Sequence, residues 1–151
     1  MKKNYSIFIL LLITVLAGSC SNAKQQSSEE KAKLPQWAIG PFERPENPNP
    51  VISPLPTKFY CPMKGDTIKW EESDTFNPAA TVKEGKIVVL YRAEDNSAQG
   101  IGKRTSRIGY AESKDGITME RRTEPVLFPM EDAFKSIEWP GGCEDPRVAM
   151  T

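Results

Sequence analysis

The sequence predicts an all-β fold, either a sandwich or a propeller. The chain after residue 33 has no stretch with a sustained helical period, and short strand-like runs follow one another at hairpin spacing from Phe59 onward. Turn signals separate these runs, at Glu84-Gly85 and again at Lys114-Asp115-Gly116. No strict internal repeat is visible, so the residue pattern alone leaves both architectures open.

Residues 1–20 have the features of a lipoprotein signal peptide, which takes no part in the fold. Lys2 and Lys3 are followed by the apolar run 7–17, which is shorter than the roughly 20 residues that a transmembrane helix needs. Small residues then lead into Cys20. This end resembles a bacterial lipobox, in which the cysteine becomes the lipidated first residue.

The alternative for this end is an ordinary signal peptide cut near Gly18 or Ser19. Residues 21–33 are rich in Ser, Gln, Glu and Lys, which predicts a disordered tether. The expected location is therefore the bacterial cell envelope, with the lipid as the protein's contact with the membrane.

The segment 34–58 is rich in proline, which predicts an extended stretch rather than a helix or a central strand. We expect it to lie over a folded body with Trp37, Phe42 and Ile52 as anchors, and the alternative is a plain linker. The folded body itself would occupy residues 59–151.

The best strand signal is Lys86 to Arg92, where a continuous apolar run is typical of a strand buried on both faces. The pairs of runs on either side of each turn signal are compatible with propeller blades. The other expected elements are strands at 79–82, 106–112 and 117–121, a short apolar run at 125–128, one or two helical turns within 131–137, and a strand that begins at 147–150.

Charge and composition exclude several functions. Lys and Arg number 20 against 20 Asp and Glu, so there is no electrostatic case for nucleic acid or an anionic membrane surface as partner. The chain has no histidine, which removes Ser-His-Asp and Cys-His nucleophiles and imidazole zinc sites. We expect no metal and no cofactor, and chemistry that rests on carboxylates.

The cysteines leave one question open. If Cys20 carries lipid, Cys61 and Cys143 remain, and they form either one disulfide or two separate free thiols. Neither a histidine nor a nearby lysine marks Cys143 as an activated nucleophile, so we interpret it as a small packing residue.

The motif Trp139-Pro140-Gly141-Gly142-Cys143-Glu144-Asp145-Pro146-Arg147 is the most informative part of the chain. Its glycines permit close approach of the backbone, and its second proline pushes Asp145 away from helix toward an extended or turn conformation. Neighbours in an extended segment point to opposite faces, so Glu144 and Asp145 are predicted to do different jobs.

Four motifs in order resemble the N-terminal part of glycoside hydrolase family 130. They are Phe76-Asn77-Pro78-Ala79-Ala80, Val89-Leu90-Tyr91-Arg92, Ser106 to Ser113 with Asp115-Gly116, and Gly141 to Arg147. The family contains β-mannoside phosphorylases and β-mannosidases on a five-bladed β-propeller. The resemblance covers about Asp74 to Thr151 and implies an all-β, five-bladed propeller of which this chain holds about two blades.

The resemblance also implies roles for residues. Asp145 matches the family's catalytic aspartic acid, which protonates the glycosidic oxygen through a sugar hydroxyl. Six further residues are implied to bind or border the sugar: Asn77, Arg92, Glu144 and Arg147, with Asp95 and Arg104 in loops that face the same pocket.

Several of these residues also have a purely structural interpretation. Asn77-Pro78 is a plausible turn, Arg92 a structural ion-pair partner, and Asp145 the cap of a turn before proline. Trp139 either stacks on a sugar or packs against the fold, whereas Trp70 is expected to pack.

The expected function is inverting hydrolysis of β-mannooligosaccharides, with Asp145 as general acid. A phosphorylase that uses inorganic phosphate as co-substrate and releases mannose 1-phosphate is the alternative, as is a non-catalytic glycan-binding lipoprotein. Hydrolysis is preferred because a lipid-anchored enzyme outside the cytoplasm would lose its sugar phosphate. A five-bladed ring needs on the order of 300 residues, so we expect this sequence to be a fragment of a longer reading frame.

Overall fold

The computed structural model describes residues 34–47 and 50–149, so Cys20, the predicted signal peptide and the predicted tether lie outside the described residues. The chain divides into two units, up to Phe42 and from Glu43 onward. Of the three predicted anchors, Ile52 packs against the core of the second unit, whereas Trp37 and Phe42 are 86% and 84% exposed. Across the described ranges, no helix has both the length and the apolar character needed to cross a bilayer.

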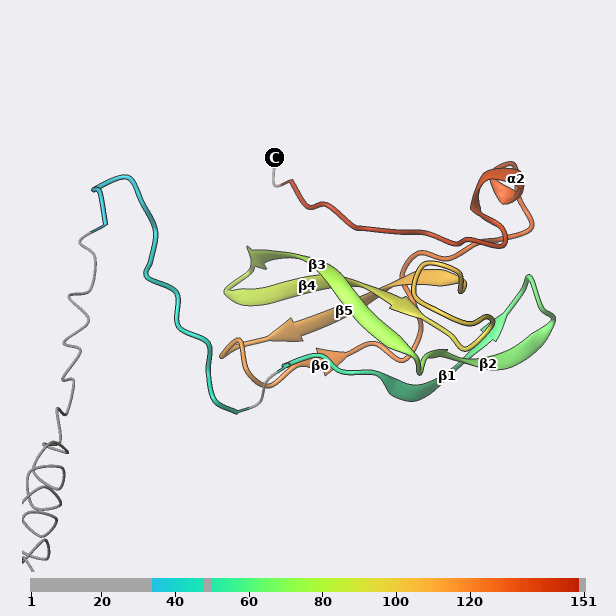
Figure 1. The fold of residues 1–151 in the computed structure, drawn as a ribbon, viewed down its shortest axis with the longest axis horizontal. Helices are drawn as coiled ribbons and strands as arrows, with labels where there is room; N and C mark the ends of the chain where they lie inside the picture. The colour runs from blue at the N-terminus through green and yellow to red at the C-terminus, as the bar shows by residue number, and fades with distance from the viewer. Residues whose placement is uncertain (1–33, 48–49, 150–151) are drawn as a thin grey trace, which may run out of the picture. The chain divides into compact units, whose positions relative to one another are not determined.

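The second unit is built from antiparallel sheets, which confirms the all-β prediction (Figure 1). One sheet has four strands in chain order, and a two-stranded hairpin forms the other. The elements are β1 (Leu55–Cys61) and β2 (Asp66–Glu71) in the hairpin, β3 (Asp74–Lys83), β4 (Lys86–Glu94), β5 (Ser106–Ser113) and β6 (Glu120–Arg121) in the sheet, and the short helix α2 (Lys135–Glu138).

The two hairpins predicted around the turn signals are not separate units. Strand β4 pairs with β5 along its length, from Ile87 opposite Ser113 to Glu94 opposite Ser106, so both hairpins belong to one sheet. As predicted, β4 is buried on both faces. This register fixes which side chains at the ends of β4 and β5 lie side by side.

Strand β1 begins at Leu55, inside the proline-rich stretch. Pro56 lies where the β1–β2 register shifts, between Leu55 and Lys58. Proline lacks the N–H that a ladder needs, and it is therefore tolerated at edge strands and bulges such as this one.

Two other predicted strands are shorter or missing. In the predicted strand 117–121 only Glu120 and Arg121 pair with β5, because Asp115 Oδ1 accepts the N–H groups of Ile117 and Thr118 and keeps them in a turn. Residues 147–149 form no strand within the described chain. The predicted helical turns are confirmed as the single turn α2.

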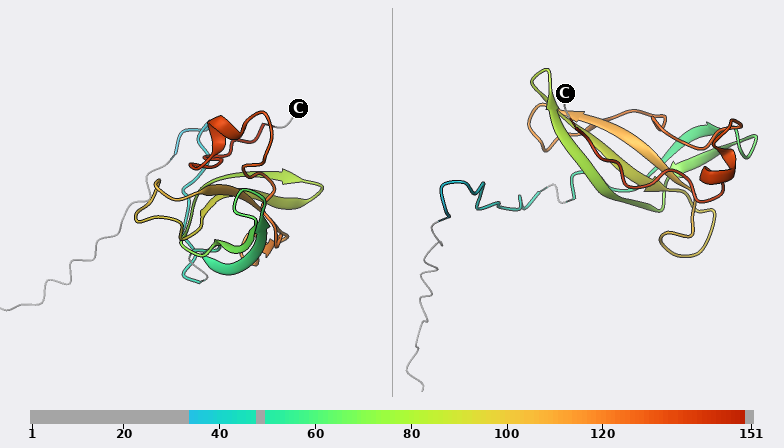
Figure 2. Two further views of the ribbon diagram at one scale, coloured as in Figure 1. Left: turned by 90° about the vertical axis from the view of Figure 1, so that its right-hand side faces the viewer. Right: turned by 90° about the horizontal axis from the view of Figure 1, so that it is seen from above.

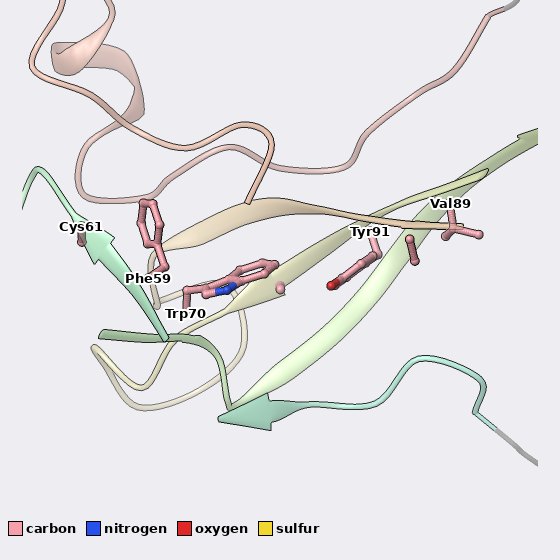
Figure 3. Close-up of a cluster of buried hydrophobic side chains, with 7 residues drawn as sticks. Phe59, Cys61, Trp70, Val89 and Tyr91 are labelled. Carbon is pink, nitrogen blue, oxygen red and sulfur yellow. The ribbon is translucent and has the colours of Figure 1, made fainter. Parts of the chain in front are cut away.

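The core lies where the hairpin packs against the four-stranded sheet (Figure 3). Phe59, Cys61 and Trp70 come from the hairpin, and they meet Val89 and Tyr91 of β4. The rings of Trp70 and Tyr91 stack with centroids 6.2 Å apart, and Trp70 Nε1 donates to the carbonyl of Thr123 at 2.9 Å. Trp70 is thus a packing residue, as expected. Burial of an apolar side chain such as Phe59 contributes about 1.5–3 kcal/mol to the free energy of folding.

A buried carboxylate ties the two sheets together. Glu71 of β2 accepts a hydrogen bond from Tyr91 of β4 at 2.8 Å and pairs with Arg121 of β6 at 3.2 Å. Burial, and then the negative charge of Glu71, raise the pKa of the Tyr91 phenol. Glu71 is therefore a buried, arginine-paired carboxylate, and among the described residues its partners are Thr57, Tyr91 and Arg121.

Replacing Gly109 tests the packing of the core. A Cβ at this position would lie 2.3 Å from the ring of Tyr91, which is 1% exposed and cannot move away without disturbing the core. Gly109→Ala should lower the free energy of unfolding of the full-length protein by at least about 1–3 kcal/mol in a urea titration. Gly141→Ala is the control, since among the described residues nothing lies within 4 Å of its added Cβ. Equal midpoints for the two variants would contradict the packing described.

Candidate active site

The acid motif lies in an irregular segment, residues 139–149, that runs back along the four-stranded sheet (Figures 1 and 2). Within the described part of the chain, its backbone bonds β5 at Ser106. Ser106 N–H donates to the carbonyl of Gly141 at 2.9 Å, and Cys143 N–H donates to the carbonyl of Ser106 at 3.0 Å. A Cβ on Gly142 would lie 2.1 Å from the Ser106 carbonyl oxygen, so glycine is required for this approach.

The side chain of Arg92 holds the next two residues of this segment. Its guanidinium binds both carboxylate oxygens of Glu144, at 2.7 and 3.0 Å, and one oxygen of Asp145 at 3.3 Å. Arg92 itself comes from the buried strand β4 and its side chain is 6% exposed. The carboxylates thus meet a cation whose position is set by the sheet.

Asn77 reaches the same acid from the edge strand β3. The β3–β4 register shifts between Phe76 and Ala79, so Asn77 lies in a bulge, with φ at 45°. Its Nδ2 donates to Asp145 Oδ1 at 2.8 Å. The bulge turns the Asn77 side chain toward Asp145, away from the direction that regular strand alternation would give it.

The expectation that Glu144 and Asp145 point to opposite faces is wrong. Asp145 has φ of 45°, in the left-handed region, rather than an extended backbone. Both carboxylates therefore turn toward Arg92. Neighbouring side chains point to opposite faces only when both residues have an extended backbone, and Asp145 does not.

The surroundings of Asp145 favour its ionised form. The hydrogen bond from Asn77 is the largest cause that lowers its pKa, burial is the next largest and opposes it, and Arg92 and Arg147 add to the lowering. The carboxyl is 42% exposed and so is open to a ligand. At neutral pH it is a carboxylate, and a proton donor would need a further change that raises its pKa.

Among the described residues, the other predicted site residues make no side-chain bond to the carboxylates of Glu144 and Asp145, although the charge of Arg147 acts on Asp145. Arg147 bonds the main-chain oxygens of Asp145 and Pro146. Arg104 pairs with Asp74 at the start of β3 and donates to the carbonyl of Ala98.

Asp95 belongs to a separate buried pair. Its carboxylate bonds Arg107 at 3.0 Å, and Lys64 lies 3.6 Å away. Burial by itself would raise the pKa of Asp95, but the Ser97 amide, Arg107 and Lys64 lower it overall. Asp95 therefore stabilises the fold through Arg107 and Lys64, and among the described residues it does not bond Asp145.

The two cysteines are free in the described structure, and both are buried. Burial, followed by the negative charge of Glu138, raises the pKa of the Cys143 thiol to about 11. The thiol is protonated at neutral pH, which fits the packing role predicted for it. Trp139 is half-buried and begins the segment, next to the last residue of α2.

Sequence reasoning missed two polar residues of this site, Glu94 and Ser106. Both are fully buried, and both bind Arg92. A signal was present, because Arg92 and Glu94 are two residues apart in one strand and so share a face. The contribution of Ser106 depends on the β4–β5 register, which no local pattern reveals.

Comparison with known proteins is consistent with this geometry. Residues 59–151 match the family model for glycoside hydrolase family 130, described as beta-1,4-mannooligosaccharide phosphorylase. The chain belongs to glycoside hydrolase family 130. The matched region contains Asn77, Arg92, Glu144 and Asp145, so the whole cluster lies within the family's part of the chain.

Two curated relatives come from Thermoanaerobacter sp. (strain X514). A 1,2-beta-oligomannan phosphorylase is 38% identical over 53% of this chain and 26% of its own length. A beta-1,2-mannobiose phosphorylase is 33% identical over 66% of this chain and 30% of its own length. The chain thus spans less than a third of either relative.

A solved structure is more similar in sequence. It is 64% identical, with a TM-score of 0.74, over 79% of this chain and 33% of that chain. It is described with the statement that the GH130 family of mannoside phosphorylases contains glycoside hydrolases that target beta-1,2 mannosidic linkages in Candida mannan. The descriptions of these similar proteins therefore mention both phosphorylases and glycoside hydrolases.

Asn77→Ala tests the electrostatics of the acid. Loss of the largest lowering cause should move the pKa of Asp145 upward, toward its ordinary value. The measurement is a ¹³C NMR titration of the full-length protein labelled at aspartate carboxyls, with the resonance assigned by Asp145→Asn. Asn96→Ala, at an exposed loop position, is the control. An unchanged or lower pKa in Asn77→Ala would contradict the role given to this hydrogen bond.

Proposed function

We propose that the protein containing this chain breaks β-mannosidic linkages, with Asp145 at the reacting centre. The observation that carries the proposal is the cluster itself: a buried arginine and an asparagine fix a carboxyl group that is still 42% exposed. Membership in family 130 supplies the substrate class. A fixed but accessible acid suits glycoside cleavage, which needs a proton for the leaving oxygen.

The lowered pKa of Asp145 must change for it to act as an acid. A sugar bound over the carboxyl would remove its water, and desolvation raises a carboxyl pKa. In this proposal Asp145 takes up a proton as the sugar binds and passes it to the glycosidic oxygen through a sugar hydroxyl. The bond from the anomeric carbon to that oxygen breaks, and a new bond forms to the acceptor on the opposite face.

The family model and both curated relatives are described as phosphorylases, the class of enzyme that uses phosphate as the acceptor. Phosphorolysis of a β-1,2-mannoside would give mannose 1-phosphate and the shortened acceptor sugar. This route fits those relatives at least as well as the hydrolysis expected from the sequence. The β-1,2 linkage is proposed because both curated relatives and the solved structure are described with it.

Hydrolysis is the second candidate, and one specific observation favours it. The solved structure described with β-1,2-specific glycoside hydrolases is 64% identical to this chain, compared with 33–38% for the phosphorylases. Water would then replace phosphate as the acceptor, and mannose would be the product.

The fold of the complete protein is part of the same proposal. We infer that the sheet β3–β6 is one blade of a five-bladed propeller and that the β1–β2 hairpin belongs to another blade. The antiparallel order of the four strands and the TM-score of 0.74 to a family 130 structure support this.

The first experiment incubates the full-length protein with β-1,2-mannobiose, with and without inorganic phosphate. Mannose 1-phosphate that appears only with phosphate supports phosphorolysis, and mannose released equally in both supports hydrolysis. Asp145→Asn should lower turnover by about 10²–10⁴-fold while sugar binding persists, because only the proton transfer is lost. Asp66→Asn, an exposed position in the β1–β2 hairpin, should keep full turnover. Sugar binding without turnover in the unmodified protein would leave the glycan-binding alternative.

We also propose that Cys20 is lipidated and anchors the protein in the cell envelope. Cells grown with a labelled fatty acid should incorporate label into the protein, and Cys20→Ser should abolish the incorporation. The N-terminal peptide, identified by mass spectrometry, should begin at Cys20. A peptide that begins near Gly18 or Ser19 without lipid would identify an ordinary signal peptide instead.

A further inference from the structure

Glu94, the last residue of β4, lies against the guanidinium of Arg92 and is 0% exposed. Its Oε1 accepts a hydrogen bond from Arg92 Nη2 at 2.9 Å and one from Ser106 Oγ at 3.2 Å. The main-chain N–H of Gly102 donates to the same carboxylate at 3.1 Å. A buried carboxylate is costly unless it is paired and hydrogen-bonded, and this one is satisfied by partners from β4, β5 and the loop between them.

The guanidinium of Arg92 is fully occupied by protein groups. Nε donates to Ser106 Oγ at 3.0 Å. Nη2 donates to Glu94 and to Glu144, and Nη1 donates to Glu144 and to Asp145. A guanidinium has five N–H bonds, and all five have partners within the described chain. Arg92 is thus placed to hold the acid segment rather than to donate to a sugar.

Glu94 and Ser106 decide how the guanidinium plane lies. They take up Nε and one N–H of Nη2, on the side that faces the sheet. The remaining N–H bonds then point along the two carboxylates of the 139–149 segment. Without these two acceptors Arg92 keeps its charge but loses the orientation that brings Nη1 to Asp145.

We propose that Glu94, together with Ser106, is a positioning residue that sets the place and ionisation of the Asp145 carboxyl through Arg92. The kinetic part of this inference rests on the proposed glycoside cleavage. The positioning itself concerns groups that are present whether or not the protein cleaves mannosides.

The charges around Asp145 give the direction of the expected effect. Arg92 faces it from β4 and Asn77, which is neutral, from β3, whereas Glu144 and Arg147 belong to its own segment. Glu94 lies behind Arg92 and offsets part of its positive charge. Glutamine keeps an oxygen that can accept from Arg92 and so preserves the orientation, but it carries no charge. In Glu94→Gln, Arg92 should therefore stabilise the Asp145 carboxylate more strongly and move its titration to lower pH.

The kinetic test compares kcat and KM for β-1,2-mannobiose in the full-length protein. Glu94→Gln should lower kcat by about 10²-fold, because Asp145 then takes up the proton for the glycosidic oxygen less readily, while KM changes by less than roughly twofold. The limb of the pH profile that reports Asp145 should move to lower pH. Ser106→Ala, which removes the acceptor of Arg92 Nε and one hydrogen bond to Glu94 but keeps the Glu94 carboxylate, should give a smaller loss of kcat. It tests the same inference if Glu94→Gln does not fold.

A second readout does not need turnover. The ¹³C titration of the Asp145 carboxyl should shift to lower pH in Glu94→Gln. An unmodified protein that leaves β-mannosides intact would refute the proposed function, and this titration would still decide the positioning role.

Glu71→Gln is the matched control. Glu71 is an equally buried carboxylate that pairs with Arg121, where the β1–β2 hairpin contacts the four-stranded sheet. It should lower the melting temperature without moving the Asp145 titration. The inference is overturned if Glu94→Gln lowers stability as Glu71→Gln does and leaves kcat and the Asp145 titration unchanged.

Discussion

The ion pair between Arg92 and the two neighbouring carboxylates, Glu144 and Asp145, is the interaction on which the site depends. The 139–149 segment has one main-chain bridge to the sheet, at Ser106. Beyond that bridge its course is set by side-chain contacts to the Arg92 guanidinium and to the Asn77 amide. Arg92 belongs to β4, a strand buried on both faces. The position of Asp145 therefore depends on how β4 pairs with its neighbouring strands.

The three carboxylates around this cation differ in exposure. The side chain of Glu94 is 0% exposed, whereas those of Glu144 and Asp145 are 48% and 42% exposed. The buried carboxylate compensates the arginine inside the protein, which leaves the exposed ones free to respond to a ligand.

The central strand and the acid motif were predictable because their signals are local. The apolar run in Lys86 to Arg92 predicts a buried strand, and a glycine pair before an acid and a proline predicts a special turn. The β1–β2 hairpin was missed, since Pro56 and the lysines and threonines of both strands hide its alternation. The structural interpretation of Arg92 as an ion-pair partner is confirmed by its contacts.

The remaining features depend on pairing between distant residues. The left-handed backbone of Asp145 contradicts the usual preference before proline, and it persists because Arg92 and Asn77 bind the side chain. Ser106 enters the site only through its place opposite Glu94. The partners in such contacts are far apart in the chain, so a short stretch of sequence does not contain both of them and cannot predict the contact.

Asn77 and Asp145 share an unusual setting: each has φ of 45°, each precedes a proline, and their side chains bond each other. Left-handed backbone is open to few residue types, and Asn and Asp are the most tolerant after glycine. The following proline fixes the next φ and removes a donor, which limits the main-chain conformations left to either residue. Little conformational entropy therefore remains to be lost here when a ligand binds, and the two positions should admit very few other amino acids.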